Sequence, residues 1–138
     1  MSARTIYLIK RLETEVTSRM IQSLSEFEIT PSQFIILSFV GDSETDLSSA
    51  QLSRRFLMTP QSMNEVVNHL KRKELLEKVR DPAHKRILRL RLTEKGLQVL
   101  DACNEAMDLL ENDLLAGLSK EELTGFRAFV RKILSGAS

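Results

Sequence analysis

The strongest constraint on the fold is a series of three helix-start signals placed close together in the chain. Thr30 and Ser48 are each followed three residues later by Gln, which is the spacing of a capping box, and Thr59 is followed by Pro60. These signals predict a helix after Thr30, a second short helix ending around Leu57, and a third helix opening at Pro60. Two short helices joined by so tight a turn are typical of a helix-turn-helix.

The apolar periodicity changes after the third helix. In that helix the apolar positions follow helical spacing, which predicts one buried face; they are Met63, Val66, Val67 and Leu70. From Leu88 to Leu92, leucine alternates with arginine, which is typical of a strand with one buried and one solvent-facing side. A shorter strand around 76–80 and a turn cluster at 81–85 precede it, so we expect a hairpin with a charged tip. A hairpin directly after a helix-turn-helix is a wing.

Long amphipathic segments flank this unit. An N-terminal segment carries an apolar stripe, and two further helices are expected after Thr93 and Ser119. The stripes consist of Ile6, Ile9, Leu12, Val16, Met20 and Leu24, then of Leu97, Leu100, Cys103, Met107, Leu110 and Leu114, then of Leu123, Phe126, Phe129, Val130, Ile133 and Leu134. They hold more apolar surface than a small winged domain needs, so we expect a symmetric homodimer. The alternative is that the flanking helices fold back on their own domain.

These elements predict a mainly α-helical protein with a small β-hairpin wing. A length of 138 residues fits a single domain, 1–138. Within it, about 30–95 would form the winged helix-turn-helix and about 1–27 and 96–138 a helical dimerisation region. The longest apolar run is too short to cross a membrane and no secretory signal is evident, so we expect a cytoplasmic protein with no membrane partner.

The net charge of +1 conceals a strongly uneven distribution. Residues 71–98 contain ten basic and four acidic side chains, whereas residues 99–124 contain one and seven. This asymmetry is expected if one face of the protein meets phosphates. A solvated basic surface is the alternative interpretation.

The third helix is the candidate recognition helix. If its apolar face is buried, its opposite face presents Gln61, Ser62, Asn64, Glu65, Asn68 and Arg72 to a groove of DNA. Amide side chains can pair with adenine, a guanidinium with guanine, and a carboxylate can accept from the amino group of cytosine. Ordinary surface polarity is the alternative for this face.

Basic side chains near the helix ends are candidates for phosphate contacts, which would make binding salt-dependent. They are Arg54, Arg55, Lys71 and Lys73, and Thr59 at the start of the recognition helix belongs to the same predicted interface. In the wing, Arg86 is the candidate for the minor groove, with Lys85 beside it. His84 can bind phosphate when protonated, although a histidine at a loop tip is more often simply solvated.

Five segments of the chain stand in a characteristic order: Ile29-Thr30-Pro31-Ser32-Gln33-Phe34, Leu52-Ser53, Thr59-Pro60, Arg80-Asp81-Pro82 and, as the most specific part, Leu90-Arg91-Leu92-Thr93-Glu94-Lys95-Gly96. Together they resemble the MarR (multiple antibiotic resistance regulator) family. The resemblance spans nearly the whole chain. It implies an obligate dimer that blocks promoters. In many members a small phenolic or other anionic aromatic ligand releases the DNA, and others respond to oxidants through cysteine.

Three residues depart from the pattern that this resemblance implies. Glu65 stands where the family more often carries Arg, so an acid would either weaken backbone contacts or favour cytosine. His84 replaces the acid that usually braces the wing tip. Glu74 replaces a Gly that is common after the recognition helix, which leaves the end of that helix open.

Effector chemistry is less evident. Tyr7, Phe27 and Phe34 could line a pocket for a small aromatic or anionic effector, although phenylalanines on amphipathic helices are usually core residues. Cys103 lies on an apolar stripe and is expected to be a buried thiol rather than a redox switch. The two histidines lack a third ligand at metal spacing, so neither a metal nor a cofactor is expected.

The chain lacks a Gly-rich phosphate loop and a Gly-x-Ser-x-Gly turn, so an enzyme is not expected. The predicted function is a sequence-specific double-stranded DNA-binding transcription regulator. It would act as a dimeric repressor on a palindromic operator and be released by a small ligand. The alternative is a winged-helix module that binds protein and not DNA, which Glu65 and the near-neutral net charge keep open.

Overall fold

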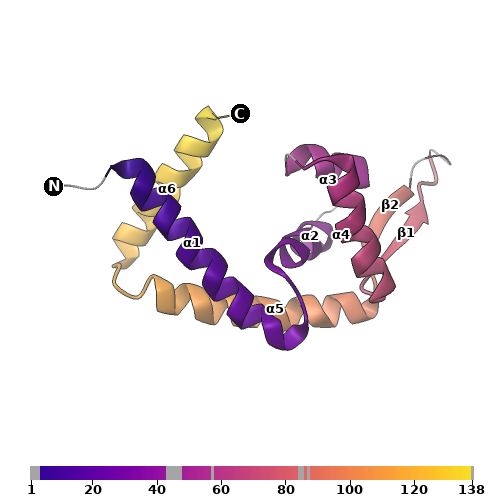
Figure 1. Cartoon of the computed structure of the whole chain (residues 1–138), viewed down its shortest axis with the longest axis horizontal. Helices are drawn as coiled ribbons and strands as arrows, with labels where there is room; N and C mark the ends of the chain where they lie inside the picture. Colours follow the sequence, from indigo (N-terminus) through magenta and orange to yellow (C-terminus); the bar gives the residue numbers. More distant parts are fainter. Residues whose placement is uncertain (1–3, 43–47, 57, 84–85, 87, 138) are drawn as a thin grey trace.

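The computed structural model describes residues 4–42, 48–56, 58–83, 86 and 88–137. These residues form six α-helices, one 3₁₀ turn and a two-stranded sheet (Figure 1). In chain order the elements are α1 (Thr5–Leu24), η1 (Ser25–Phe27), α2 (Pro31–Asp42), α3 (Ser49–Arg55), α4 (Pro60–Arg72), β1 (Leu76–Arg80), β2 (Leu88–Leu92), α5 (Glu94–Leu114) and α6 (Lys120–Gly136). The predicted class, mainly helical with a hairpin wing, is confirmed.

The three predicted helix starts are also confirmed. Gln33 N–H donates to Thr30 Oγ1 at 3.2 Å, and Thr30 N–H donates back to the Gln33 side chain at 3.1 Å. Ser48 and Gln51 form the same reciprocal pair ahead of α3, at 3.2 and 2.9 Å. Thr59 caps α4. Each pair satisfies backbone N–H groups that have no partner inside the helix, so the start of each helix is fixed locally.

The recognition-helix candidate α4 ends in a left-handed turn at Glu74. This residue has φ 64°, and its N–H donates to the carbonyl of Lys71 at 2.9 Å. The next N–H, of Leu75, reaches back to the carbonyl of Leu70 at 3.0 Å. This is the Schellman arrangement, and both leucines are buried beneath it. The helix end that the sequence left open therefore lies at Arg72, with Glu74 in a conformation that favours glycine.

The wing is an antiparallel hairpin whose register runs from Leu76↔Leu92 to Arg80↔Leu88. The predicted alternation in β2 holds only in part. Leu90 and Leu92 are buried, but Leu88 is 45% exposed. The reason is its position in the last pair of the ladder, where the hairpin extends past the core.

The core lies under the helix-turn-helix and is shared by every element except α6. Its fully buried side chains include Leu24, Ile36, Leu37, Leu52, Met63, Val67, Leu70, Leu76, Leu90 and Cys103. The predicted inner face of α4 is confirmed at three of its four positions, and Val66 is half-buried. The predicted stripe of α5 is less complete, because Leu97 is 49% exposed. The short helix α3 ends at Arg55 and not around Leu57, which lies outside the described residues.

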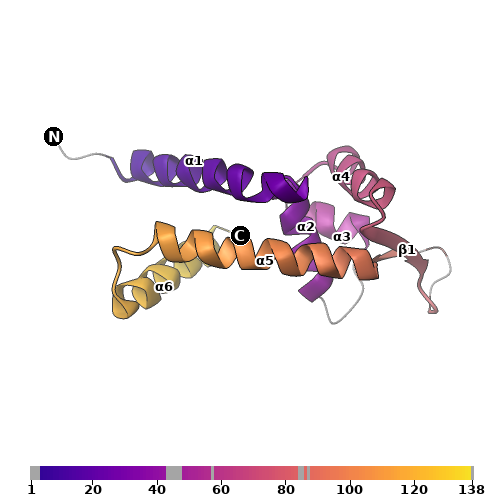
Figure 2. The same ribbon diagram turned by 90° about the horizontal axis from the view of Figure 1, so that it is seen from below.

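The flanking helices extend away from this core. Figures 1 and 2 show α1 and α6 on the side opposite the wing, with α5 running from the wing base towards α6. No residue of α6 is buried. Large apolar side chains are exposed on α1 (Ile6, Tyr7, Leu8, Ile9, Leu12) and on α6 (Phe126, Phe129, Val130, Ile133, Leu134). Within a single chain these stripes therefore stay uncovered. None of the described helices combines the length and the apolar character that crossing a bilayer requires.

Candidate nucleic-acid interface

The outward face of α4 is a continuous row of polar side chains. Met63, Val67 and Leu70 anchor the helix in the core, which turns the other side of the helix to solvent. The six predicted contact residues on this helix are all exposed: Gln61, Ser62, Asn64, Glu65, Asn68 and Arg72. The helix therefore presents amide, hydroxyl, carboxylate and guanidinium groups together, which are the groups that can read base edges.

Two hydroxyl groups at the start of α4 are held by the helix cap. Thr59 Oγ1 accepts from the N–H of Ser62 at 3.1 Å and lies 2.9 Å from the Ser62 hydroxyl. Both side chains are exposed, and the first N–H groups of a helix favour an anion. This end of α4 can therefore receive a phosphate as well as a base edge.

The basic side chains around α4 differ in how they are held. Arg54 is exposed, whereas the guanidinium of Arg55 lies 5.3 Å from the ring centroid of Phe39, as a cation–π contact. Arg72 lies 3.5 Å from the ring of His69 on the same helix. The ammonium group of Lys73 donates to the backbone carbonyl of Glu28, in the turn between α1 and α2. The sequence predicts a phosphate contact for Lys73, but the structure directs its ammonium into this internal contact.

The wing brings Arg86 to the surface, where it is exposed. The predicted neighbours His84 and Lys85 lie outside the described residues. A bracing acid is present although position 84 lacks one. Asp81, at the entry to the wing turn, accepts from Arg89 at 2.9 and 3.1 Å, so an acid outside position 84 braces a wing strand. The alternation in β2 predicts a solvent-facing Arg89, and it gives no sign that this side chain is held.

The segment Leu92-Thr93-Glu94-Lys95-Gly96 joins the wing to α5. Thr93 caps α5, and its hydroxyl donates to the carbonyl of Glu74 at 2.6 Å. Its backbone N–H donates to the carbonyl of Leu75 at 3.1 Å. Gly96 lies so close to that carbonyl that an added Cβ would stand 2.1 Å from its oxygen. The most specific part of the resemblance is therefore a junction that fixes α4, β1 and α5 together.

The three predicted pocket residues do not line one pocket of a single chain. Tyr7 is 64% exposed near the start of α1, whereas Phe27 and Phe34 pack against the core at its other end. A 20-residue helix spans about 30 Å, so one small ligand cannot touch both ends. Tyr7 is thus separated from Phe27 and Phe34 by the length of α1, and the residue types alone do not reveal this separation.

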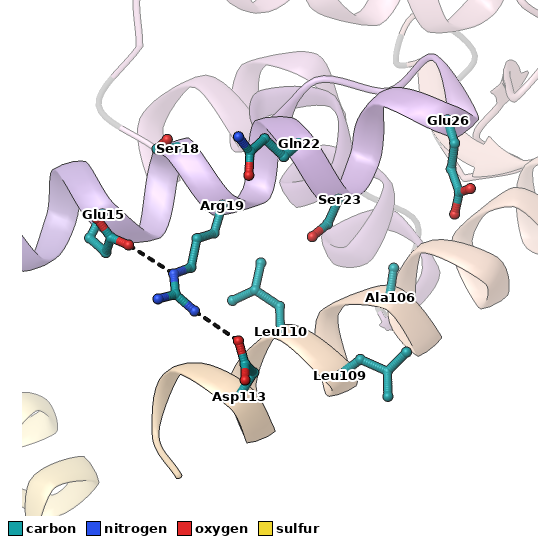
Figure 3. Close-up of a pocket in the computed structure, with 10 residues that line it drawn as sticks. All are labelled: Glu15, Ser18, Arg19, Gln22, Ser23, Glu26, Ala106, Leu109, Leu110 and Asp113. Atoms are coloured by element: carbon teal, nitrogen blue, oxygen red, sulfur yellow. Dashed lines mark hydrogen bonds and ion pairs between the residues drawn. The ribbon is translucent and has the colours of Figure 1, made fainter. Parts of the chain in front are cut away.

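A separate open groove of about 780 Å³ lies between α1 and α5 (Figure 3). Its cation is Arg19, which donates to Glu15 at 2.9 Å and to Asp113 at 3.1 Å. The hydrogen bond with Glu15 contributes most to a raised pKa of Arg19. The carboxylates that surround this guanidinium leave little positive charge for an anionic effector.

The remaining candidates for chemistry are the thiol of Cys103 and a possible metal site. Cys103 is buried, and burial raises the pKa of its thiol, so the reactive thiolate is disfavoured. Within the described part of the chain, no three His, Cys, Asp or Glu side chains gather in a way that could hold a metal ion.

Known proteins match this arrangement. A model of the MarR family matches residues 27–87. The uncharacterized HTH-type transcriptional regulator YsmB of Bacillus subtilis is 24% identical over 110 residues, which cover 80% of this chain and 75% of YsmB. The PcaV transcriptional regulator of Streptomyces coelicolor, solved with its natural ligand, is 29% identical, with a TM-score of 0.83 and full coverage of both chains.

The fold also matches MepR of Staphylococcus aureus in its complex with DNA. The TM-score is 0.85 at 24% identity, over 98% of this chain and 97% of MepR. The family model covers the helix-turn-helix and the start of the wing, and the structural matches extend over the flanking helices. Residues 27–87 therefore match the MarR family, and the chain as a whole has the fold of winged helix-turn-helix transcriptional regulators such as MepR and PcaV.

Proposed function

We propose that this protein is a sequence-specific repressor that binds a palindromic operator in double-stranded DNA as a homodimer and is released by a small ligand. The observation that carries the proposal is the row of exposed polar side chains on α4, held outward by the buried side chains of Met63, Val67 and Leu70. A helix that is anchored in this way can enter a major groove without losing its packing.

The roles within the interface follow from side-chain chemistry. Gln61, Asn64 and Asn68 are proposed to read adenine, and Glu65 to accept from the amino group of cytosine. Arg54, Arg55, Thr59, Ser62 and Arg72 are proposed to contact phosphates or base edges at the two ends of the helix pair. In the wing, Arg86 is proposed to enter the minor groove, with Lys85 beside it.

The homodimer is supported by the apolar side chains that one chain leaves uncovered on α1 and α6. Phe129 is 68% exposed and Ile133 64% exposed, and no residue of α6 is buried. Monomeric proteins rarely expose so many large apolar side chains together. A two-fold dimer through these helices would present two copies of α4, which fits half-sites about one helical turn, or roughly 34–36 Å, apart.

Dimerisation is tested by sedimentation velocity. Phe129→Asp should convert the dimer to monomer, because a carboxylate would be buried in the interface. Leu88→Asp, at the far end of the wing, is the matched control and should leave the dimer intact. A wild-type protein that sediments as a monomer at micromolar concentration would refute this part of the proposal.

Ligand release is supported by PcaV, which was solved with its natural ligand and shares the fold over the whole chain. The ligand class proposed here is a small aromatic or anionic molecule. An aromatic carboxylate such as benzoate should weaken binding to the operator in a saturable way, and an aliphatic carboxylate of similar charge is the control. Equal effects of the two acids would point to ionic strength and not to a site.

DNA recognition is tested by selection from a random duplex pool at about 0.15 M salt, followed by affinity against salt concentration. An enriched palindrome with a steep salt dependence is expected. Arg86→Ala should weaken binding to all duplexes alike, whereas Gln61→Ala and Asn68→Ala should relax sequence choice. Absence of duplex binding would favour the protein-interaction module.

Repression itself needs a reporter. With the selected operator placed across a promoter, expression should fall when the protein is supplied and recover in the Gln61→Ala variant. A rise in expression would instead identify an activator.

A further inference from the structure

Arg89 in β2 makes three hydrogen bonds that join two distant parts of the winged helix. Its Nε and Nη2 donate to Asp81 Oδ2 at 3.1 and 2.9 Å, at the entry to the wing turn. Its Nη1 donates to Gln51 Oε1 at 3.0 Å, on α3. The Arg89 and Asp81 side chains are only 23% and 13% exposed, so this pair is better shielded than an ordinary surface ion pair.

Both partners of Arg89 also organise the backbone around them. Asp81 Oδ1 accepts from the N–H of Ala83 at 2.9 Å, which shapes the turn that leads towards the wing tip. Gln51 Oε1 accepts from the N–H of Ser48 at 2.9 Å, as part of the capping box of α3. One guanidinium therefore connects the entry of the wing turn to the N-terminus of α3.

We propose that Arg89 is a positioning residue for DNA binding, which holds the wing and its Arg86 at a fixed place relative to α3 and α4. This inference rests on the proposed function, because it assumes that α4 and the wing contact the same duplex. In this arrangement the guanidinium of Arg89 is used internally, so its effect on DNA binding passes through Arg86 and not through a phosphate of its own.

Neutralising Asp81 provides a test, because the two possible roles of this residue change the affinity for DNA in opposite directions. If Asp81 were only an acid near a basic surface, its neutralisation would lessen repulsion of phosphates and tighten binding. If it positions the wing through Arg89, Asp81→Asn weakens binding instead. Glu77, an exposed acid on β1, is the matched control, and Glu77→Gln should leave affinity unchanged or slightly raise it.

Arg89→Lys provides a second test, because lysine keeps the charge but lacks the planar fork that reaches two partners. We expect Asp81→Asn and Arg89→Lys each to weaken duplex binding by about fivefold or more, as loss of roughly 1 kcal/mol implies. The slope of log affinity against log salt should fall by about 0.9 for each phosphate that the variant no longer neutralises. In the Arg89→Lys background, Arg86→Ala should have a much smaller effect than in the wild type.

The measurement is fluorescence anisotropy on one selected duplex at several salt concentrations, with circular dichroism to confirm that each variant is folded at the assay temperature. Wild-type binding together with an unchanged or tighter Asp81→Asn variant would overturn the inference. Fully additive effects of Arg86→Ala and Arg89→Lys would also overturn it, because they would show that Arg89 acts independently of the wing tip. Failure of the wild-type protein to bind any duplex would instead overturn the proposed function, and the inference with it.

Discussion

Replacement of Gly96 by alanine should destabilise the folded protein through a backbone clash. An added Cβ would stand 2.1 Å from the carbonyl oxygen of Leu75, closer than any real contact of this kind. The carbonyl oxygen is a backbone atom, so the clash is relieved only if α5 moves away from Leu75, in the turn between α4 and β1. That movement lengthens two hydrogen bonds at the junction, from Thr93 to Glu74 at 2.6 Å and from Thr93 to Leu75 at 3.1 Å.

The expected cost can be assembled from these contacts. Overpacking of a close junction costs about 1–3 kcal/mol. Weakening of one or both hydrogen bonds adds about 1 kcal/mol, since each contributes about 0.5–1.5 kcal/mol net. The higher intrinsic helix propensity of alanine than of glycine offsets less than about 1 kcal/mol of this loss. We therefore expect Gly96→Ala to lower the free energy of unfolding by about 2–3 kcal/mol.

Urea unfolding followed by circular dichroism measures this difference, at one fixed protein concentration because a dimer's stability depends on it. Gly117→Ala is the matched control, since nothing lies within 4 Å of a Cβ at that position. It should change stability by no more than about 0.5 kcal/mol. A Gly96→Ala variant as stable as this control would refute the argument that the junction requires a glycine.

Three further predictions concern single side chains. Glu74→Gly should raise the free energy of unfolding by about 0.5–1 kcal/mol in urea titrations. Glycine relieves the strain of the left-handed backbone at φ 64°, and this gain exceeds the stabilisation of the unfolded chain by its added entropy. A loss of stability would contradict this. The backbone N–H of Ser119 lowers the pKa of Glu122, so the stabilisation that Glu122→Gln removes should be full at pH 7 and fade as the pH falls through the lowered pKa of the folded state. A urea midpoint difference that is equal at pH 7 and pH 3 would exclude this role. Cys103 should react with a disulfide reagent at least about tenfold more slowly in the native protein than in urea. The reason is that burial raises the pKa of its thiol and blocks access of the reagent. Equal rates would show that the thiol is accessible.

Most of the fold could be predicted because the helix starts are local. The hydroxyl groups of Thr30, Ser48 and Thr59 each accept a hydrogen bond from the backbone N–H three residues later. Both partners of each cap therefore lie within one short stretch of sequence. The two strands of the hairpin likewise lie where the alternation of β2 and the turn cluster before it predicted them. The inner face of α4 followed from helical periodicity alone.

The parts that sequence reasoning missed depend on contacts between distant segments. The hydrogen bond between Arg89 and Gln51 joins residues that are 38 positions apart. The alternation of β2 does not distinguish an arginine that is hydrogen-bonded within the protein from one that faces solvent. The sequence around Lys73 gives no sign that its partner is a backbone carbonyl 45 positions earlier. The conformation of Glu74 was also hidden, because tertiary burial of Leu75 imposes a turn for which glutamate has no intrinsic preference.

The long helix α5 begins two positions after the last residue of β2, at a junction that has no loop to bend. Its 21 residues make a rod of about 30 Å between the base of the wing and the turn that leads into α6. The close approach of Gly96 to Leu75, directly before β1, ties the first turn of α5 to the base of the wing. A change in the tilt of α5 would therefore move the wing with it, and the angle between the two α5 helices of the proposed dimer would set the distance between its two wings.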